Sequence, residues 1–397
     1  MGQGPKSIAQ RYLGAISYTR LILANIKWAV FGRISRPGQF NPLINTEIFF
    51  IESHDRGDLR KETALLKASL GPNVLSVVVA HKTRAFNLKN SFIAFFLIVI
   101  NIKSVLSATS STTNSLAFIQ KALLVSECFQ ALSHAIDLFP FYARSKSVFS
   151  FQEVTLTENI VCQVANGLGL RTYAFQHAIS LGLVDRYLDR TRSKPTHLDD
   201  TILEASVCNV VFCWGNIQRD LFKAFTRAHP VVIGRASLDA ATQAIRSSPD
   251  GITFIFDSDC FNSERLMELV RKSIFFGFPV SLWFKPKTEH SRVFSAERIG
   301  PLRRFVIGGK SSLLPQLAVG GSSVFILSQS YFERFLPPNL IIHDFDDLVK
   351  AYTAIDSYRG EVWQDFIAYT GVTTLKKLQA FVFSHRNDEE LCEVGVR

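Results

Sequence analysis

The sequence lacks the short motifs that identify the commonest nucleotide-binding and hydrolytic α/β enzymes. No G-x-G-x-x-G follows its first apolar strand and no G-x-x-x-x-G-K-[ST] occurs, which disfavours a dinucleotide dehydrogenase and a P-loop nucleotide hydrolase. No G-x-S-x-G is present either, so an α/β-hydrolase would have no nucleophile. An α/β protein without these loops can still hold a nucleotide with helix N-termini and lysines.

Paired cysteines are also missing. None of the six cysteines forms a C-x-x-C pair, and Cys208 with Cys213 has no second half that would complete a metal site. Most cysteines sit inside hydrophobic runs, where a reduced thiol behaves as a small apolar side chain. We therefore expect no metal site and a cytoplasmic location. The first residues lack the basic and then apolar block of a secretory signal, which agrees with that expectation.

Acidic residues are fewer than basic ones. The chain has 44 Lys and Arg against 34 Asp and Glu, and its net charge of +10 favours anionic partners. Nucleic acid, acidic lipids and phosphorylated substrates are all anionic, so charge alone does not choose among them. The basic residues are scattered, without zinc-finger spacing or an aromatic-interleaved repeat, and nucleic acid is therefore not expected as a partner.

No apolar run is long enough to span a bilayer. The longest, FIAFFLIVI at 92–100, falls well short of the roughly 20 residues of a membrane-spanning helix. It predicts a buried strand. Residues 7–34 contain no proline and predict a basic helix within an N-terminal segment, 1–45. This helix either packs on the main body or rests on a membrane surface, and its weak amphipathic moment favours packing.

From residue 46 onward, apolar strands alternate with helices. Continuous apolar strands joined by helices are typical of parallel sheets covered on both faces. A polar stretch at 240–251 separates two rounds of alternation, which predicts an N-terminal domain over 46–240 and a C-terminal domain over 241–397 that ends in helices. The predicted fold class is α/β, with two Rossmann-like doubly wound parallel-sheet domains. Strands are predicted at 46–53, 73–82, 92–100, 148–154, 171–176, 207–215, 229–234, 252–258, 279–286, 323–329 and 339–344.

Polar residues follow these strands at the points where each one ends. Ligands of open α/β sheets bind beyond the carboxyl ends of the strands, so these residues are candidates for a ligand site. Polar residues also occur at strand ends for purely structural reasons, which keeps both interpretations open. The candidates are Glu52, Ser53 and His54, then His81 and Lys82, Gln176 and His177, residues 257–259 and 285–287, Ser328 to Ser330, and His343 with Asp344.

Several segments resemble one family in their order and spacing. TENIVCQVANGLGLRTYAFQHA, at 157–178, is similar to a segment of spaced Glu, Ala and Gly ending in Gln-His-Gly. That segment belongs to bacterial surface-carbohydrate transferases with the GT-B fold, which include capsule, lipopolysaccharide and CDP-glycerol glycerophosphotransferase-like enzymes. Further segments that resemble this family are FFIESHDRGDLRKETALL at 49–66, CWGNIQRDLFKAFTRAHPVVIGRASLD at 213–239, LWFKPK at 282–287 and SQSYFERF at 328–335.

The resemblance implies an interdomain cleft with an acceptor side. Glu158 and His177 would lie in this cleft, and either could take the proton of an acceptor hydroxyl as general base. Asp185 is a weaker candidate for the same task, and Glu52, Arg56 and Gln176 would line the cleft. The structural alternatives are that His177 caps its strand and that Glu158 is a solvated carboxylate in the first turn of a helix.

The resemblance also implies a donor side in the C-terminal domain. Lys285 and Lys287 would neutralise the donor phosphate, and Ser328 and Ser330 would contact it. Glu333 would hydrogen-bond the ribose or the base. The structural alternative for the serines and the glutamate is an ordinary capping arrangement.

The predicted function is transfer of a sugar from a nucleotide-activated donor, such as a CMP-linked acidic sugar, to a surface glycan or lipid-linked acceptor. No cofactor is expected beyond the nucleotide-sugar substrate, and lysines rather than a metal would meet the charge of the leaving group. The N-terminal helix and the net charge would keep the enzyme at the inner membrane face. Two alternatives stay open: a CDP-glycerol-type phosphotransferase, and a catalytically inactive assembly protein, since Ala178 replaces the glycine of the family motif.

Overall fold

The computed structural model describes most of the chain in ranges separated by gaps. These are residues 48–52, 57–78, 88–100, 115–142, 145–151, 156–176, 206–238, 250–256, 260–284, 298–309, 311, 313–330, 332–355, 358 and 360–394, with residues 22, 23 and 26. Of the helix predicted at 7–34, only Ile22, Leu23 and Ile26 are described, and these three are helical. None of the described helices is both long and apolar enough to cross a bilayer.

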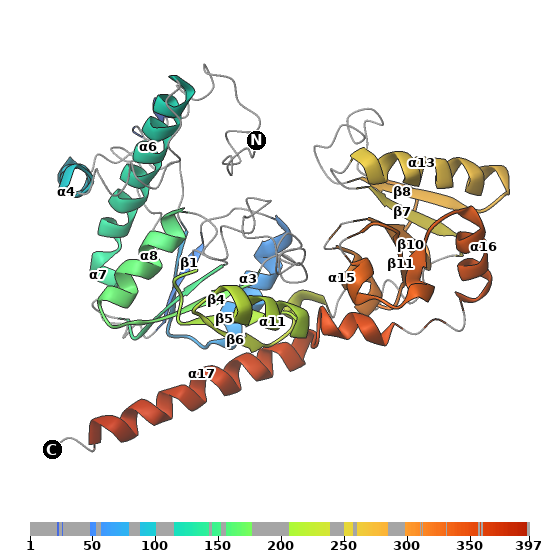
Figure 1. The fold of residues 1–397 in the computed structure, drawn as a ribbon. Coiled ribbons are helices and arrows are strands. Elements are labelled where there is room, and N and C mark those ends of the chain that lie inside the picture. Colours follow the sequence, from blue (N-terminus) through green and yellow to red (C-terminus); the bar gives the residue numbers. More distant parts are fainter. Residues whose placement is uncertain are drawn as a thin grey trace. The chain divides into compact units, whose positions relative to one another are not determined.

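The chain divides into two compact units, each containing one sheet (Figure 1). The first unit comprises Met1–His177, Asp189–Cys213 and Asp220–Val231, and the second comprises Ala178–Leu188, Trp214–Arg219 and Val232–Arg397. Both are α/β with Rossmann-like parallel sheets, which confirms the predicted fold class.

Six described strands form the sheet of the first unit. Their order is β2 (Val74–Val78), β1 (Ile48–Glu52), β3 (Ser147–Ser150), β4 (Arg171–Phe175), β5 (Val210–Cys213) and β6 (His229–Val232). The pairs from β2 to β5 are parallel. The order reverses between β1 and β3, and ligands of such sheets gather outside the carboxyl ends at the point of reversal.

The second sheet has the strand order of a dinucleotide-binding fold. It runs β12 (Ile341–Ile342), β11 (Ser323–Leu327), β10 (Phe305–Gly308), β7 (Ile252–Phe256), β8 (Val280–Phe284) and β9 (Arg298–Ile299). All pairs are parallel except β8 with β9, which is antiparallel. Counted from β7, the order is 6-5-4-1-2-3, and the reversal lies between β7 and β10.

Stacked aromatic rings join the strands of the first sheet. Phe50 of β1 pairs with Phe149 of β3, which pairs with Tyr173 of β4. Their ring centroids are 6.4 Å and 4.5 Å apart, and Phe212 of β5 continues the row 5.7 Å from Tyr173. Since the rings lie nearly parallel across neighbouring strands, each adds cross-strand stabilisation to the burial of its own surface.

Helices accompany both sheets. Those with the first sheet are α3 (Gly57–Ser69), α6 (Ser115–Asp137), α7 (Phe139–Tyr142), α8 (Leu156–Gly167) and α11 (Asn216–Phe225). Those of the second unit are α13 (Cys260–Phe275), α15 (Leu313–Val319), α16 (Phe345–Thr353) and α17 (Gly371–Val394). Burial of Tyr358 between β11 and the helices raises its pKa to about 12, and its hydroxyl donates to Val324 O at 3.3 Å. Burial likewise raises the pKa of Tyr142.

Two predictions of secondary structure need correction. The run at 92–100 is not a buried strand but part of helix α4 (Leu88–Ile100). Its apolar residues surround the helix, so they carry neither helical nor strand periodicity. In the second sheet, β10 was not predicted because its short FVIG run is followed directly by another glycine. This strand is central, lying between β7 and β11.

The segment Trp214–Arg219 belongs to the second unit, although it lies between strands of the first in sequence. Trp214 is buried in the second core, and its carbonyl accepts a hydrogen bond from Ala368 N at 2.9 Å. The guanidinium of Arg235 lies 4.6 Å from the ring of Trp214, and Arg235 N donates to Tyr369 O at 2.8 Å. Trp214 and Arg235 therefore both bond to the backbone of residues 368–369, which attaches the segment to the second unit.

Gly234 offers a test of this attachment. Its φ is +88°, and a Cβ there would overlap the backbone carbonyl of Tyr369. Gly277 has a similar φ of +80° but nothing within 4 Å of its position for a Cβ, so it is a matched control. We expect Gly277→Ala to lower the free energy of unfolding by about 1–2 kcal/mol, the strain of a left-handed residue.

Gly234→Ala should lower it by about 3 kcal/mol or more, since the overlap adds to the same strain. Denaturant unfolding of the full chain measures both. Equal losses in the two variants would show that the backbone of Tyr369 does not pack on Gly234 as described.

Candidate functional site

The structure describes about half of the predicted site residues. His177, Asp185, Lys285, Lys287 and Arg56 lie outside the described ranges, and only the backbone of Glu52 is described, at the end of β1. The described residues fall into two groups. Glu158 and Gln176 belong to the first unit, whereas Ser328, Ser330 and Glu333 belong to the second.

Glu158 and Gln176 follow the carboxyl ends of two neighbouring strands of the first sheet. Gln176 directly follows β4, and its backbone N–H continues the sheet with a bond to Phe212 O at 3.0 Å. Glu158 lies in the first turn of α8, the helix that follows β3, and β3 and β4 are neighbours. Both side chains are buried, Glu158 completely. The alternative interpretation of Glu158 as a solvated carboxylate is therefore wrong.

The best-defined site in the second unit is the turn after β11. We call it the β11 loop: residues 328–330 with Phe332 and Glu333. Gln329 is exposed and has a φ of +67°, a left-handed conformation that is uncommon for a residue other than glycine. Such a conformation costs about 1–3 kcal/mol and persists only where the surrounding contacts impose it. Contacts made by Ser328, Ser330 and Glu333 impose this conformation on Gln329.

Arg265 of α13 holds the start of the β11 loop. Its Nη1 donates to Ser328 O at 2.8 Å, and its Nη2 donates to Ser328 Oγ at 2.8 Å and to His343 O at 3.1 Å. One planar guanidinium thus joins α13 to the carboxyl ends of β11 and β12. Because Ser328 Oγ accepts from Arg265, it positions the loop.

Ser330 and Glu333 hold the other end of the loop. The hydroxyl of buried Ser330 donates to Gly309 O, just beyond β10, and accepts from Phe332 N at 3.3 Å. Glu333 Oε2 accepts from Gln329 N at 2.6 Å. A carboxylate therefore satisfies the amide of the left-handed residue. Among the described residues, none is bonded to the second oxygen of this half-buried carboxylate.

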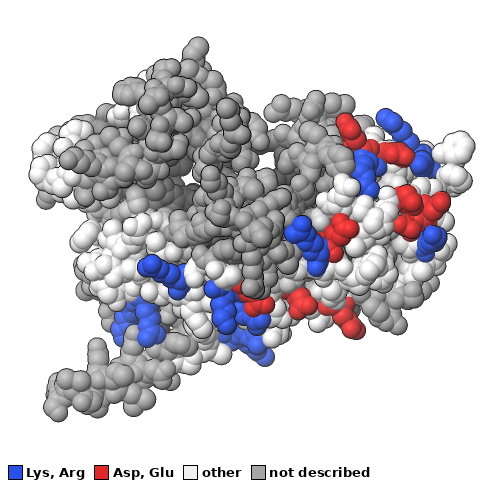
Figure 2. Space-filling model, in the orientation of Figure 1, with Lys and Arg blue, Asp and Glu red and all other residues white. Residues whose placement is uncertain are grey.

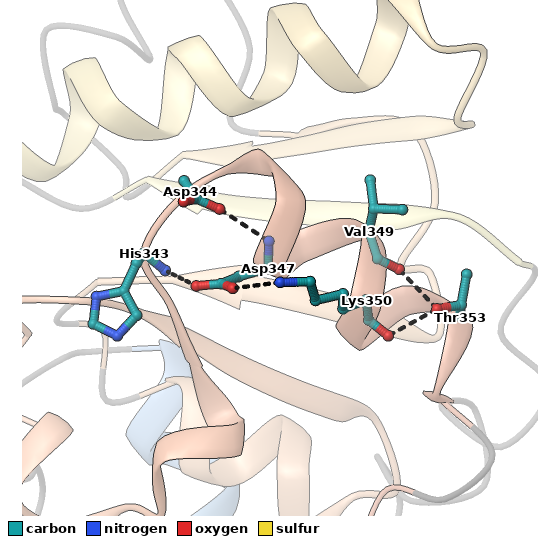
Figure 3. Close-up of polar contacts among 6 residues, drawn as sticks. All are labelled: His343, Asp344, Asp347, Val349, Lys350 and Thr353. Atoms are coloured by element: carbon teal, nitrogen blue, oxygen red, sulfur yellow. Dashed lines mark hydrogen bonds and ion pairs between the residues drawn. The ribbon is translucent and has the colours of Figure 1, made fainter.

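The polar residues after β12 have a structural role (Figure 3). Asp344 is the N-cap of α16 and accepts from Asp347 N at 3.0 Å, while Asp347 accepts from His343 N at 3.3 Å. Lys350 forms an ion pair with Asp347 at 3.7 Å. The imidazole of His343 points away from these contacts. Here the structural interpretation of a polar strand end holds, because the side chains start a helix.

Charge and metal ligands add little to this site. On the face shown in Figure 2, acidic and basic side chains alternate over α13 and α16, so the excess positive charge is not gathered there. Among the described residues, no three His, Cys, Asp or Glu side chains form a group that could hold a metal ion. The described site can therefore offer a fixed carboxylate and backbone groups at the ends of β10 and β11.

Comparisons with known proteins do not assign the chain to a family. No protein-family model matches it, and no curated protein matches it significantly. Similar solved structures include one from Listeria monocytogenes described as a UDP-N-acetylglucosamine 2-epimerase, with 11% identity, TM-score 0.47, and 86% of this chain and 97% of that chain covered.

Two plant proteins give similar values. One is a UDP-glucosyltransferase from Polygonum tinctorium, with 13% identity, TM-score 0.41, and 84% and 93% of the two chains covered. The other is a Medicago truncatula protein complexed with UDP-glucose, with 11% identity, TM-score 0.37, and 85% and 94% covered. With TM-scores below 0.5, these likenesses do not bear on the function of this chain.

Sequence reasoning missed Arg265 and the backbone conformation of Gln329. Arg265 lies within an ordinary helix, and no pattern marks it as a ligand of a loop more than 60 residues away. Gln329 was among the strand-end candidates, but nothing in its residue type indicates a left-handed backbone. Ser328, Ser330 and Glu333 were indicated by the polar end of the strand and by the family motif that follows it.

Arg265→Lys tests whether the guanidinium holds the β11 loop. A lysine ammonium cannot span the three acceptors in the same plane, and loss of bonds to a charged donor lowers stability by about 1–3 kcal/mol. We expect a loss of that size in denaturant unfolding, with faster hydrogen exchange of the backbone amides of 328–330. Exposed Arg271 on the same helix is the control, and Arg271→Lys should change stability by less than about 0.5 kcal/mol. Equal effects of the two substitutions would contradict the role of Arg265.

Proposed function

We propose that the chain is a glycosyltransferase that moves a sugar from a nucleotide-activated donor to a surface glycan or lipid-linked acceptor. The second unit would bind the nucleotide at the carboxyl ends of β10 and β11, and the first unit would supply the general base. Support comes from the tandem Rossmann-like sheets, the resemblance of the motifs to GT-B surface-carbohydrate transferases, and the geometry of the β11 loop.

The carboxylate of Glu333 is the observation that carries the donor site. One oxygen is fixed by Gln329 N at 2.6 Å, so the orientation of the group is set before any ligand binds. The second oxygen can accept a hydrogen bond from a ribose hydroxyl, and bonds to a charged acceptor are stronger than neutral ones. The ribose is common to all nucleotide donors, whereas the base and the sugar differ.

Lys285 and Lys287, which follow β8, would neutralise the diphosphate or monophosphate that leaves with the nucleotide. Ser328 and Ser330 would act indirectly, since their hydroxyls hold the loop that carries Glu333. In the first unit, Glu158 or His177 would take the proton of the acceptor hydroxyl as the new glycosidic bond forms. Acceptors linked to lipid would place the enzyme at the inner membrane face.

A nucleotide screen tests the donor site. In calorimetry with CMP, CDP, UDP and GDP, we expect selective binding of one nucleotide, which names the donor class. Glu333→Gln keeps an acceptor for Gln329 N but loses the charge, and it should raise the Kd roughly tenfold or more. Exposed Glu268 of α13 is the control, and Glu268→Gln should leave the Kd unchanged.

The screen also separates the competing functions. Absence of binding to all four nucleotides in the folded protein would overturn the enzyme proposal and favour an assembly protein. Release of CMP from CDP-glycerol would favour the phosphotransferase over the glycosyltransferase.

Replacement of the candidate bases tests the transfer step. With the matching nucleotide sugar and a membrane fraction as acceptor, we expect Glu158→Gln or His177→Ala to slow transfer by about 100-fold or more, the range for loss of a general base. Nucleotide affinity should stay unchanged. Gln163→Ala, on the exposed side of α8, is the control and should transfer as the unaltered protein does. If both Glu158→Gln and His177→Ala retain full turnover, neither residue is the base.

A further inference from the structure

Helix α4 presents an apolar face outward from the first unit. Only Ser91, Ala94 and Ile98 of the described side chains in α4 are buried, at the spacing of one helix face. That face packs on α6, which packs on α8 and through it on the sheet, so α4 is the outermost of these layers (Figure 1). Phe95 lies at the margin of that face, with its ring 6.4 Å from the ring of Phe129 of α6. The opposite side, here called the outer face, includes Phe92, Phe96, Val99 and Ile100, each at least half exposed.

An exposed face of this composition is unusual for a monomeric domain. Single exposed apolar residues are common, but a contiguous patch of this kind marks a surface that contacts something apolar. From Asn90 to Asn101 the chain contains no charged residue. The thirteen residues of α4 cannot span a bilayer, which takes roughly 20 residues. The face can therefore contact an apolar phase only from its surface.

The charge of the surrounding sequence indicates what that phase is. Between Glu62 and Glu127 there is no Asp or Glu, and the basic residues in this stretch are Lys67, Lys82, Arg84, Lys89, Lys103 and Lys121. Four of them flank the apolar run closely on both sides. An apolar, phenylalanine-rich helix with basic residues on both sides of it in the sequence is typical of helices that lie in the interface of an anionic membrane.

Charge also distinguishes a membrane from a second copy of the chain. In a two-fold symmetric dimer built on this face, the same basic segment would lie against itself. Like charges brought together at an interface oppose association. An anionic lipid surface complements both features of α4, the apolar side chains and the basic flanks.

We infer that the outer face of α4 docks on an anionic lipid surface, with the phenylalanines among the acyl chains near the headgroups. The helix lies parallel to the membrane plane, since its exposed side runs along its length. The inference rests on residues of the first unit and stands whether or not the chain transfers sugars.

Flotation of the full chain with vesicles tests this inference. We expect binding to vesicles of phosphatidylcholine and phosphatidylglycerol in equal parts, and much weaker binding to phosphatidylcholine alone. Phe92→Ser combined with Phe96→Ser should lower the partition coefficient roughly tenfold or more. Leu168→Ser, which removes an exposed apolar side chain elsewhere in the first unit, is the control and should bind normally.

A second variant keeps the test decisive if the double substitution unfolds the protein. Phe92→Trp retains the size and character of the site, and we expect its added fluorescence to be quenched by lipids brominated on their acyl chains. No flotation of the unaltered chain, flotation of the folded double variant at the normal level, or an unquenched tryptophan would each overturn the inference. Loss of a dimer in sedimentation, without loss of flotation, would assign the face to self-association instead.

Discussion

Parallel pairing of short apolar strands is the constraint on which both units depend. Parallel strands need a crossover for every connection, and among the described crossovers α3, α8, α13 and α15 each join two parallel strands and cover the sheet. The pairing also brings the carboxyl ends of all parallel strands to one edge. In the first sheet the row of rings from Phe50 to Phe212 strengthens this pairing across the strands. The position of each candidate site follows from that edge.

The alternation of apolar strands and helices was enough to predict the two sheets, because buried parallel strands are continuous apolar runs. It failed where an apolar run was not a buried strand. In α4 the residues away from α6 are as apolar as those against it, so the sequence shows no polar face that would indicate a helix. It also failed at β10, where only three apolar residues lie between an arginine and a pair of glycines, so the segment resembles a turn.

The candidate site shows a similar limit. Strand ends and family motifs predicted Ser328, Ser330 and Glu333, but their roles depend on contacts that no local pattern shows. Ser328 binds Arg265 of a distant helix, and Ser330 binds the backbone beyond β10. Strain at Gln329 and the bond from its amide to Glu333 are properties of the assembled loop. The loop is thus shaped by contacts within the protein, and a site that is ordered in advance loses less free energy on binding.

The attachment of Trp214–Arg219 to the second unit affects the order in which the protein can fold during synthesis. Asn216 and Asp365, whose side chains bond at 3.2 Å, are 149 positions apart in the chain. At synthesis rates of about 5–20 residues per second, roughly 7 to 30 s pass between the two. For that time Trp214, a core residue of the second unit, has no finished core to enter. The nascent chain therefore exposes a large apolar side chain next to completed strands, and this interval is when a chaperone would have most to bind.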